Sequence, residues 1–358
     1  MIAGGGTGGH IFPAIAIANA IKKLNPTTNF LFVGAKGKME MEKVPQAGYA
    51  IEGITIAGFN RSSLIKNLSL PFKLINSFFQ VAQIIRQFKP DAVIGVGGYS
   101  SFPVLRYAQS KGIPTFIHEA NSYAGKSNML LGKMATKIFT ATDGMEKFFP
   151  ANKIIVSGNP VRSAIVSMNV NKSTALQHFG LDPEKKTVLV VGGSLGAKSI
   201  NEAIEKDIDL FAKNDLQLIW QTGKLFLSKA KETTLGMKHV FVNDFIQEME
   251  MGYAAADMVI SRSGAMSISE LCIVGKPVAF VPYPFAAEDH QTANAQKLVQ
   301  KHAAIMIEDK RALQDLVPQI IELSRDVTKQ NIMKENIQQL KITNADDCVA
   351  NEIMTYLK

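Results

Sequence analysis

Cysteine is scarce in this sequence, which holds only Cys272 and Cys348 among its 358 residues. So few cysteines exclude a disulfide framework and favour a reducing cytoplasm as the compartment. No apolar run approaches the roughly 18 residues that a membrane-spanning helix needs, and no signal peptide is recognisable. We therefore expect a globular protein without a spanning helix.

Long runs of charge of one sign are also absent. The formal net charge is +8, but no cluster of about five or six basic residues occurs, so nucleic acid is the least favoured anionic partner. A moderate positive excess suits phosphorylated substrates or anionic lipid. The hydrophobic content of 46% and charged content of 20% are ordinary for a globular chain, and this length favours two domains.

What the sequence does contain is a series of glycine-rich turns, each placed after a short apolar segment. The first lies at residues 4–10 and precedes a helical pattern. Gly4, Gly6 and Gly9 match the dinucleotide fingerprint G-x-G-x-x-G. That fingerprint requires an acid at the end of the second strand, and the strand expected at 30–33 has none at its tip. We therefore expect the turn to cradle a phosphate or pyrophosphate rather than NAD.

Two histidines stand at expected strand ends. His10 directly follows the first glycine turn, where it could act as a base near neutral pH. A turn histidine hydrogen-bonded to the backbone would have the same spacing, so both interpretations stay open on the residues alone. His118 and Glu119 end another expected strand and could serve acid–base chemistry. They are not the metal motif H-E-x-x-H, because Ser122 stands where its second histidine would be.

Strand, glycine turn and helix recur in both halves of the chain. The strand expected at 91–96 runs into Gly97-Gly98, and the second half restarts with a strand at 187–191 followed by Gly192-Gly193. This alternation predicts the α/β class, with two Rossmann-like doubly wound domains facing a cleft that is the default ligand site. The expected divisions are residues 1–162, 163–340 and 341–358, the last being a helix that packs back on the N-terminal domain.

The stretch 258–295 carries the densest polar chemistry. A short strand ends at Arg262-Ser263-Gly264, and a helix is expected from about Ala265, with hydroxyls and one acid, Glu270, in its first turns. N–H groups at a helix N-terminus bind phosphate, and a carboxylate suits a ribose diol, so the pattern indicates a nucleoside diphosphate. The segment from Ser267 to Glu270 also fits a capping box, in which the acid only closes the first helical turn. On this motif alone the two interpretations are equally favoured.

Residues 61–90 are apolar and basic, and no Asp or Glu occurs between residues 53 and 90. The apolar positions are too many for one buried stripe of a helix. An apolar surface with only positive charge suits peripheral contact with anionic lipid. The alternative is a core helix with solvated lysines.

Seven motifs together resemble the MurG family of GT-B glycosyltransferases, in that family's order along the chain. They are GGGTGGHIFPA (4–14), VGGYSSFP (96–103), HEANSYAGKSN (118–128), GNPVR (158–162), GGSLGAKSIN (192–201), RSGAMSISEL (262–271) and EDHQTANA (288–295). They are highly specific jointly, although none is specific alone.

The resemblance implies a hexosyltransferase that moves N-acetylglucosamine from UDP-N-acetylglucosamine to the muramyl 4-hydroxyl of lipid I, giving lipid II of peptidoglycan. Lipid I is undecaprenyl-pyrophosphoryl-N-acetylmuramyl-pentapeptide. The resemblance further implies that the N-terminal domain faces the acceptor and the membrane, and that the C-terminal domain binds the UDP-sugar. Residues 61–90 would contact the anionic inner leaflet, which places the enzyme peripherally on the cytoplasmic side of the bacterial inner membrane.

The same resemblance assigns substrate contacts to individual residues. Arg162 would hold diphosphate oxygens, Ile246 would contact uracil through its backbone, and Glu270 would bind the ribose hydroxyls. The other implied contacts are Thr7, Gly8, Gly9 and Asn121 in the first domain, and Ser194, Ala265, Met266, Ser267, Ile268, Ser269 and Gln291 in the second.

The implied mechanism is a single displacement with inversion at the anomeric carbon. His10 is the first candidate for the base that removes the acceptor proton, and Glu119 or His118 is the second. Helix N-termini after Gly193 and Gly264 would stabilise the charge on the leaving diphosphate. No Asp-x-Asp pair is placed to hold a metal there, so we expect neither a metal nor a cofactor.

Three alternatives stay open at this point. The first is a GT-B transferase with another acceptor, for which the apolar basic stretch favours a lipid over a small molecule. The second is a UDP-N-acetylglucosamine 2-epimerase, which shares the two-domain architecture and needs no membrane contact. The third, a non-enzymatic nucleotide sensor, leaves the motifs of the first domain unexplained.

Overall fold

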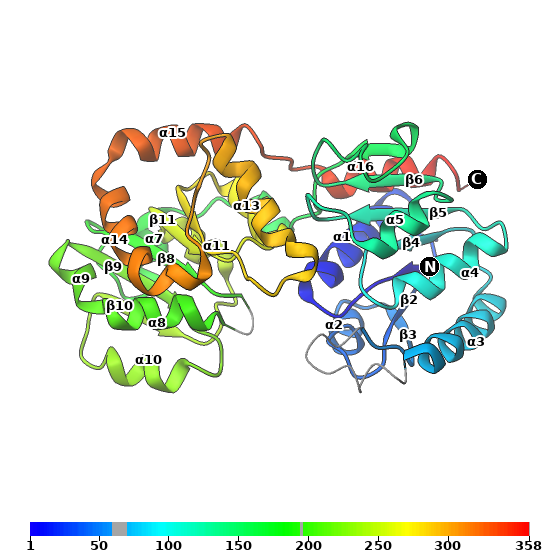
Figure 1. Ribbon diagram of the computed structural model, residues 1–358, viewed down its shortest axis with the longest axis horizontal. Coiled ribbons are helices and arrows are strands. Elements are labelled where there is room, and N and C mark those ends of the chain that lie inside the picture. Colours follow the sequence, from blue (N-terminus) through cyan, green and yellow to red (C-terminus); the bar gives the residue numbers. More distant parts are fainter. Residues whose placement is uncertain (59–69, 194–195, 358) are drawn as a thin grey trace. The chain divides into compact units, whose positions relative to one another are not determined.

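The computed structural model describes residues 1–58, 70–193 and 196–357 of the chain. The chain separates into two compact units, one made of residues 1–162 and 342–358 and the other of residues 163–341 (Figure 1). Each unit is a parallel β-sheet covered by helices. This architecture confirms the predicted α/β class with two doubly wound sheets.

The sheet of the first unit has, among the described residues, seven parallel strands in the order β3-β2-β1-β4-β5-β6-β7. The strands are β1 (Ile2–Ala3), β2 (Leu31–Ala35), β3 (Ala50–Ile54), β4 (Val93–Gly95), β5 (Thr115–Glu119), β6 (Lys137–Thr140) and β7 (Ile154–Val156). The chain starts in the middle of the sheet, builds outward to β3, and then crosses to the other side of β1. Ile2 therefore pairs with Phe32 on one side and with Ile94 on the other. This reversal between β1 and β4 is a topological switch point.

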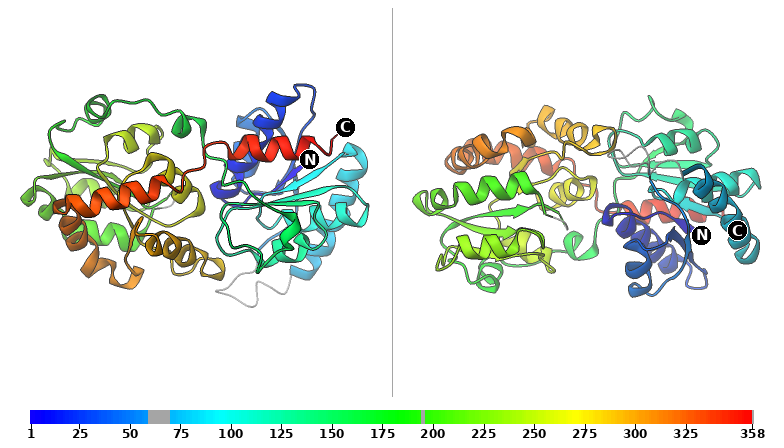
Figure 2. Two further views of the ribbon diagram at one scale, coloured as in Figure 1. Left: turned by 90° about the horizontal axis from the view of Figure 1, so that it is seen from above. Right: turned by 60° about the horizontal axis from the view of Figure 1, so that its bottom comes forward.

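Helices connect these strands, and their buried faces follow the helical period. The helices are α1 (Gly8–Leu24), α2 (Glu40–Gln46), α3 (Leu70–Phe88), α4 (Ser101–Ser110), α5 (Lys126–Gly132) and the last helix, α16 (Ala345–Met354), with a 3-10 turn, η2, at Ala151–Lys153. In α1, Ala14, Ala18 and Ile21 are buried at spacings of four and three, which keep them on one side. Helix α16, red in Figure 2, packs against α1, and its Val349 and Ile353 belong to the same apolar core.

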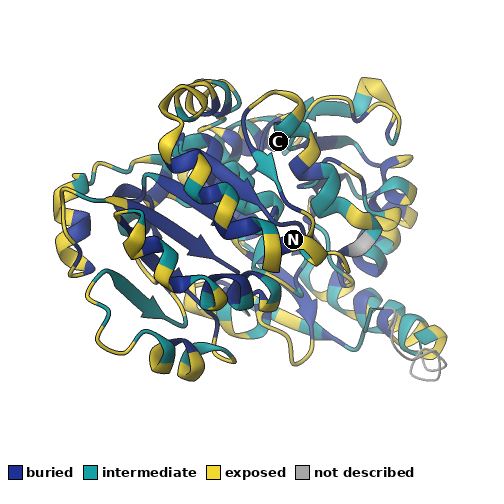
Figure 3. Ribbon diagram, turned by 60° about the vertical axis from the view of Figure 1, so that its left-hand side comes forward, coloured by how far each residue is buried: buried dark blue, intermediate teal, exposed yellow. Residues whose placement is uncertain are grey.

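The sheet of the second unit repeats this topology. Its described strands lie in the order β10-β9-β8-β11-β12-β13, all parallel, so its switch point is between β8 and β11. The strands are β8 (Lys186–Val191), β9 (Leu216–Gln221), β10 (Val240–Asn243), β11 (Met258–Ser261), β12 (Val278–Phe280) and β13 (Ile305–Met306). In Figure 3 the central strands are buried while the helices expose their outer faces.

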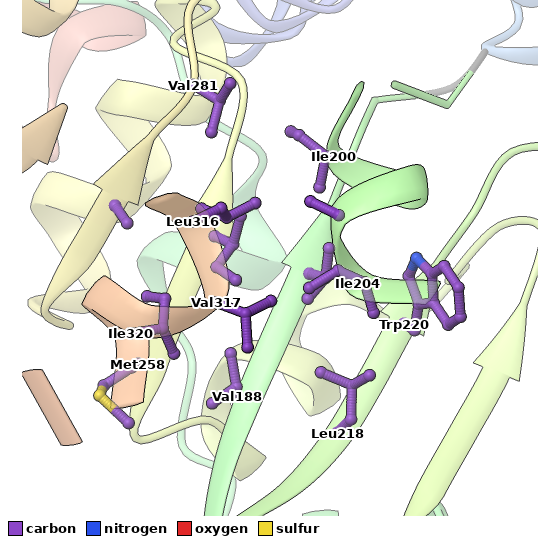
Figure 4. Close-up of a cluster of buried hydrophobic side chains, with 14 of the residues drawn as sticks. Val188, Ile200, Ile204, Leu218, Trp220, Met258, Val281, Leu316, Val317 and Ile320 are labelled. Carbon is purple, nitrogen blue, oxygen red and sulfur yellow. The ribbon is translucent and has the colours of Figure 1, made fainter. Parts of the chain in front are cut away.

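The helices of the second unit close its core from both faces of the sheet. They are α6 (Ser163–Val166), α7 (Lys172–His178), α8 (Lys198–Lys206), α9 (Ile208–Lys213), α10 (Leu227–Thr233), α11 (Met249–Ala255), α12 (Ala265–Val274), α13 (His290–Gln300), α14 (Ala312–Arg325) and α15 (Val327–Gln338), with 3-10 turns η3 (Ala287–Asp289) and η4 (Asp309–Arg311). Figure 4 shows Ile204 of α8 and Val317 of α14 beside Val188 of β8. Trp220, also in this cluster, is fully buried and donates its indole N–H to the Asn201 side-chain oxygen at 3.0 Å.

The helix expected from about Ala265 begins at that residue and extends to Val274 as α12. Gly264 is the N-cap of α12, and Gly275 ends the helix in a left-handed conformation, with φ at 68°. Pro277 cannot continue the helix, and β12 starts directly after it. In the described part of the chain, every helix is too short or too polar to cross a bilayer.

Candidate active-site regions

The first unit brings two glycine turns together at the ends of its central strands. β1 and β4 are neighbours, so the turns at residues 4–7 and 96–100 lie at one edge of the sheet. The Ser101 hydroxyl donates to the carbonyl oxygens of Ala3 and Gly97, at 2.8 Å each, and so ties the two strand ends together. Ligands of doubly wound sheets bind at such a switch point.

Three predicted contacts lie at the start of α1. Thr7 is the N-cap of the helix and is exposed, while Gly8 and Gly9 form its first turn and are half-buried. The first N–H groups of a helix have no partner within it, and the helix dipole adds positive potential there. This part of the glycine turn is therefore suited to an anionic group.

His10 lies between the two glycine turns of the first unit. Its Nδ1 is 3.0 Å from the carbonyl oxygen of Gly5 and 3.4 Å from the hydroxyl of Thr7. A carbonyl only accepts, so this contact assigns the proton of the neutral ring to Nδ1 and leaves the lone pair on Nε2. A Cβ on Gly97 would stand 2.7 Å from Nε2, so the glycine of the second turn makes room for the ring. The backbone-bonded interpretation is therefore correct for Nδ1.

Glu40 supports the first glycine turn, a role that the sequence analysis did not predict. Its side chain is buried, and its carboxylate accepts the N–H of Gly6 at 2.8 Å and the N–H of Ala35 at 2.9 Å. A Cβ on Gly5 or on Gly34 would come within 2.4 Å of its side-chain atoms. The acid that the dinucleotide fingerprint requires at the second strand is thus replaced by one that binds the glycine turn itself. The buried carboxylate of Glu40 therefore holds the backbone of the first glycine turn in place.

His118 is buried behind His10 and faces the protein interior. Its Nε2 donates to the Gly158 carbonyl oxygen at 3.2 Å, and its Nδ1 has no hydrogen-bond partner among the described residues. Burial lowers the pKa of His118 to about 4, the hydrogen bond to Gly158 opposes this shift, and the nearby charge of His10 adds to it. A ring that is 1% exposed cannot reach a substrate proton, so this geometry argues against His118 as the base.

Glu119 is also buried, and both of its carboxylate oxygens are used within the loop that follows β5. Oε1 accepts the backbone and side-chain N–H groups of Asn121, at 3.0 and 3.3 Å. Oε2 accepts from the backbone of Gly125 at 3.1 Å and the side chain of Asn128 at 2.8 Å. These four hydrogen bonds satisfy the carboxylate oxygens and shape the loop. Glu119 therefore positions Asn121, and its geometry disfavours it as the base.

Arg162 and Ser194 are two of the predicted diphosphate and nucleotide contacts. Arg162 is half-buried and is the last residue of the first part of its unit, directly before α6. Ser194 lies outside the described residues.

The second unit presents the start of α12 at its own switch point, beside the turn that follows β8. The predicted contacts there are all half-buried and lie in the first turns of the helix: Ala265, Met266, Ser267, Ile268 and Ser269. The capping-box alternative is wrong, because α12 starts at Ala265 with Gly264 as its N-cap, which places Ser267 inside the helix.

Glu270 is positioned by a neighbouring helix. It is buried, and its Oε2 accepts the hydroxyl proton of Tyr253 at 3.0 Å. Tyr253 belongs to α11 and is itself buried. This bond ties the carboxylate of α12 to α11.

Gln291 and the loop before it are held to the end of β11. Its Oε1 accepts the N–H of Tyr283 at 2.9 Å, and its carbonyl accepts the Ser263 hydroxyl at 2.8 Å. Glu288 and Asp289 adopt left-handed backbone conformations, with φ at 49° and 52°, which are uncommon for residues other than glycine. Gln291 is half-buried, so the strained loop presents a polar side chain near the start of α12.

Arg262 is a structural residue that could be mistaken for a phosphate ligand. Its Nη1 donates to the carbonyls of Val281 and Pro282 and forms an ion pair with Asp309 at 2.5 Å. Its Nη2 contacts the Ser199 hydroxyl at 3.1 Å. With its charge paired in this way, the guanidinium joins β11, the loop after β12 and α8.

Ile246 lies in the loop after β10 and is buried. Its N–H donates to Oε1 of Gln221 at 2.9 Å, and Nε2 of the same glutamine donates to the Gly193 carbonyl at 3.1 Å. The two contacts expected at Ile246 and next to Gly193 are thus linked by one buried side chain. Among residues 1–58, 70–193 and 196–357, no group of three or more His, Cys, Asp or Glu side chains could hold a metal.

Comparisons with known proteins agree over nearly the whole chain. Residues 1–140 match the glycosyltransferase family 28 N-terminal domain, and residues 187–349 match the glycosyltransferase family 28 C-terminal domain. A relative from Parabacteroides distasonis is 51% identical over 99% of this chain and 97% of its own length. Its name is UDP-N-acetylglucosamine–N-acetylmuramyl-(pentapeptide) pyrophosphoryl-undecaprenol N-acetylglucosamine transferase.

Solved structures agree with the family and the fold found by these comparisons. The crystal structure of MurG from Acinetobacter baumannii covers 99% of both chains with a TM-score of 0.79 at 28% identity. A UDP-GlcNAc 2-epimerase from Neisseria meningitidis, solved with UDP-GlcNAc, covers 99% of both chains with a TM-score of 0.66 at 15% identity. At that identity the likeness to the epimerase shows the fold alone.

Proposed function

Because the chain belongs to glycosyltransferase family 28, and within it to the MurG enzymes, we propose that it transfers N-acetylglucosamine from UDP-N-acetylglucosamine to lipid I with inversion, forming lipid II. The chain is a hexosyltransferase of peptidoglycan synthesis. The observation that carries this conclusion is the 51% identity, over 99% of the chain, to an enzyme named for this reaction.

The second unit is the proposed donor site. Glu270, fixed by Tyr253, would accept hydrogen bonds from the ribose hydroxyls. The start of α12 would face the diphosphate, since its first N–H groups and its dipole favour negative charge. Ile246 would meet the uracil and Gln291 a sugar hydroxyl. Arg162 and Ser194 are proposed diphosphate or nucleotide contacts on the resemblance alone.

The first unit is the proposed acceptor site. The muramyl 4-hydroxyl would attack the anomeric carbon while Nε2 of His10 takes its proton, and UDP would leave. The bond from Nδ1 of His10 to Gly5 supports this role, because it selects the tautomer whose Nε2 can accept. Thr7, Gly8, Gly9 and Asn121 would hold the acceptor beside this nitrogen.

Helix α3 supports a proposed contact with the anionic inner leaflet, on the cytoplasmic face of the membrane. Phe72, Ile75 and Phe79 are 75%, 57% and 72% exposed, and their spacing places them on one face of the helix. The opposite face is buried, so the alternative of a core helix accounts for only half of α3. The earlier part of the predicted membrane stretch, residues 61–69, lies outside the described residues.

The test is release of UDP from UDP-N-acetylglucosamine with and without a soluble lipid I analogue. We expect release that depends on the analogue and a product that carries the transferred sugar. An epimerase would consume the donor without an acceptor and without releasing UDP. Absence of acceptor-dependent release at saturating donor would contradict the proposed reaction, while thermal stabilisation by UDP would report on the donor site separately.

A further inference from the structure

The side chain of Gln221 joins two loops of the second unit. Gln221 ends β9, which lies between β8 and β10 in the sheet, and its side chain is 1% exposed. Its Nε2 donates to the Gly193 carbonyl, in the glycine turn after β8, at 3.1 Å. Its Oε1 accepts the N–H of Ile246, in the loop after β10, at 2.9 Å. One buried carboxamide on the middle strand thus reaches the loops that follow both neighbouring strands.

We propose that Gln221 is a positioning residue for the nucleotide, which holds the backbone at Gly193 and at Ile246 in its binding arrangement before the donor arrives. The inference rests on the proposed function, in which the turn at Gly193 meets the diphosphate and the loop at Ile246 meets the base. A carboxamide carries both a donor and an acceptor, so it can satisfy a carbonyl on one side and an N–H on the other. Loops ordered in advance lose less conformational freedom on binding, which appears as affinity.

The same strand offers a matched control at its other end. Gln217 lies four residues before Gln221 and therefore on the same face of β9, and it is also 1% exposed. Its Nε2 donates to the carbonyl of Asp182 at 2.6 Å and to the hydroxyl of Thr187 at 3.0 Å. Its Oε1 accepts the N–H of Asp182 at 3.1 Å. Removing either glutamine disturbs a buried amide network, but only Gln221 touches the proposed donor loops.

The experiment compares Gln221→Met with Gln217→Met, because methionine keeps the length of the side chain and packs adaptably. Calorimetry gives the affinity for UDP, and thermal unfolding without ligand gives the structural cost. Both variants should lower the unfolding midpoint. Gln221→Met should weaken UDP binding by roughly tenfold or more, since two polar groups lose their partner, and Gln217→Met should change it by no more than about twofold.

Steady-state kinetics separate a positioning role from a purely structural one, because only a positioning role changes the KM for the donor selectively. Gln221→Met should raise the KM for UDP-N-acetylglucosamine while kcat at saturating donor stays near the wild-type value. Should this variant fail to fold, Gln221→Leu replaces it. Leucine likewise removes both the donor and the acceptor of the carboxamide, so the same loss of UDP affinity is expected.

The outcomes separate the inference from the proposed function. Equal effects of the two methionine variants on UDP binding would overturn the positioning role, because Gln221 would then be a structural residue like Gln217. Tighter binding by Gln221→Met would also overturn it, since Oε1 would then compete with the base for the N–H of Ile246. Failure of the wild-type protein to bind UDP would remove the proposed donor site and the inference with it.

Discussion

At the scale of single residues, His10 is the group whose geometry most directly suggests chemistry. Its Nδ1 is bonded to Gly5 and its Nε2 lies beside Gly97. We expect His10→Gln to keep a donor near Gly5 but to lose the base. The value of kcat should fall by about 100-fold or more, because the acceptor proton is then removed only by water. The affinity for UDP should stay within about twofold, since the donor contacts lie in the other unit.

The comparison variant for His10 is His178→Ala. His178 is in α7 and has an exposed side chain, whose Nε2 lies 3.7 Å from the Glu248 carboxylate. Its removal should leave kcat unchanged. If His10→Gln retains most of the wild-type kcat, another group is the base.

His118 should make the stability of the protein depend on pH. Burial lowers its pKa to about 4 from the ordinary value of 6.5, so the unfolded chain binds a proton more readily than the folded one. The free energy of unfolding should therefore be highest above pH 6.5 and fall as the pH drops from 6.5 towards 4. The contribution of this ring over that range is about 3 kcal/mol at most.

Denaturant unfolding at several pH values measures this dependence, with His118→Gln as the reference. Glutamine preserves a donor for the Gly158 carbonyl, which His118 now contacts at 3.2 Å, but it does not titrate. Carboxylates affect both proteins equally, so the wild type should lose more stability than the variant below pH 6.5. Parallel pH profiles would show that the burial of His118 does not govern acid stability.

At the scale of elements, α3 has one buried face and one face that exposes large apolar side chains. Ser77, Val81 and Ile85 are buried, while the opposite face carries Phe72 and Phe79 in the open. We expect Phe72→Glu combined with Phe79→Glu to abolish co-sedimentation with vesicles rich in anionic lipid. Apolar burial in the membrane is lost and charge repulsion is added. Turnover of a soluble acceptor analogue should be unaffected.

A second pair of exposed apolar residues tests whether two added glutamates anywhere on the surface would abolish vesicle binding. Leu225 and Leu235 flank α10 and are 96% and 87% exposed. Changing both to Glu adds the same charge to the protein but should leave vesicle binding intact. Equal loss of binding in both double variants would point to net charge alone, and no loss in either would contradict the role of α3.

The elements that carry the site followed from the sequence to different extents. Apolar spacing and glycine turns predicted the strands and the start of α12, because these signals are local. Glu40 could not be found in this way, since its partners Gly6 and Ala35 come together only when β1 and β2 pair. The same is true of Gln221, whose two contacts belong to loops of separate strands.

At the scale of the whole molecule, the two units use one architecture for different tasks. In each parallel sheet the order in which strands are added reverses beside the first strand. Each unit places a glycine turn and a helix N-terminus at that switch point. The repetition explains why the class of fold was predictable from alternating strands and glycines. The role of each carboxylate was not, because it depends on the hydrogen-bond partners that the fold provides. Those partners show that Glu119 shapes the loop after β5 and that Glu270 of α12 is bonded to Tyr253 of α11.

The shared architecture also leads to a prediction about metals for the complete enzyme. A leaving diphosphate needs positive potential, and helix N-termini such as that of α12 supply it through fixed backbone dipoles. The formal net charge of +8 adds attraction for the anionic donor. We therefore expect full turnover in excess EDTA and no more than a small change on adding magnesium. The measurement is UDP release at saturating donor and acceptor analogue, before and after chelation. Strict loss of activity that magnesium restores would show that a metal bridges the diphosphate and that the helix N-termini are not sufficient.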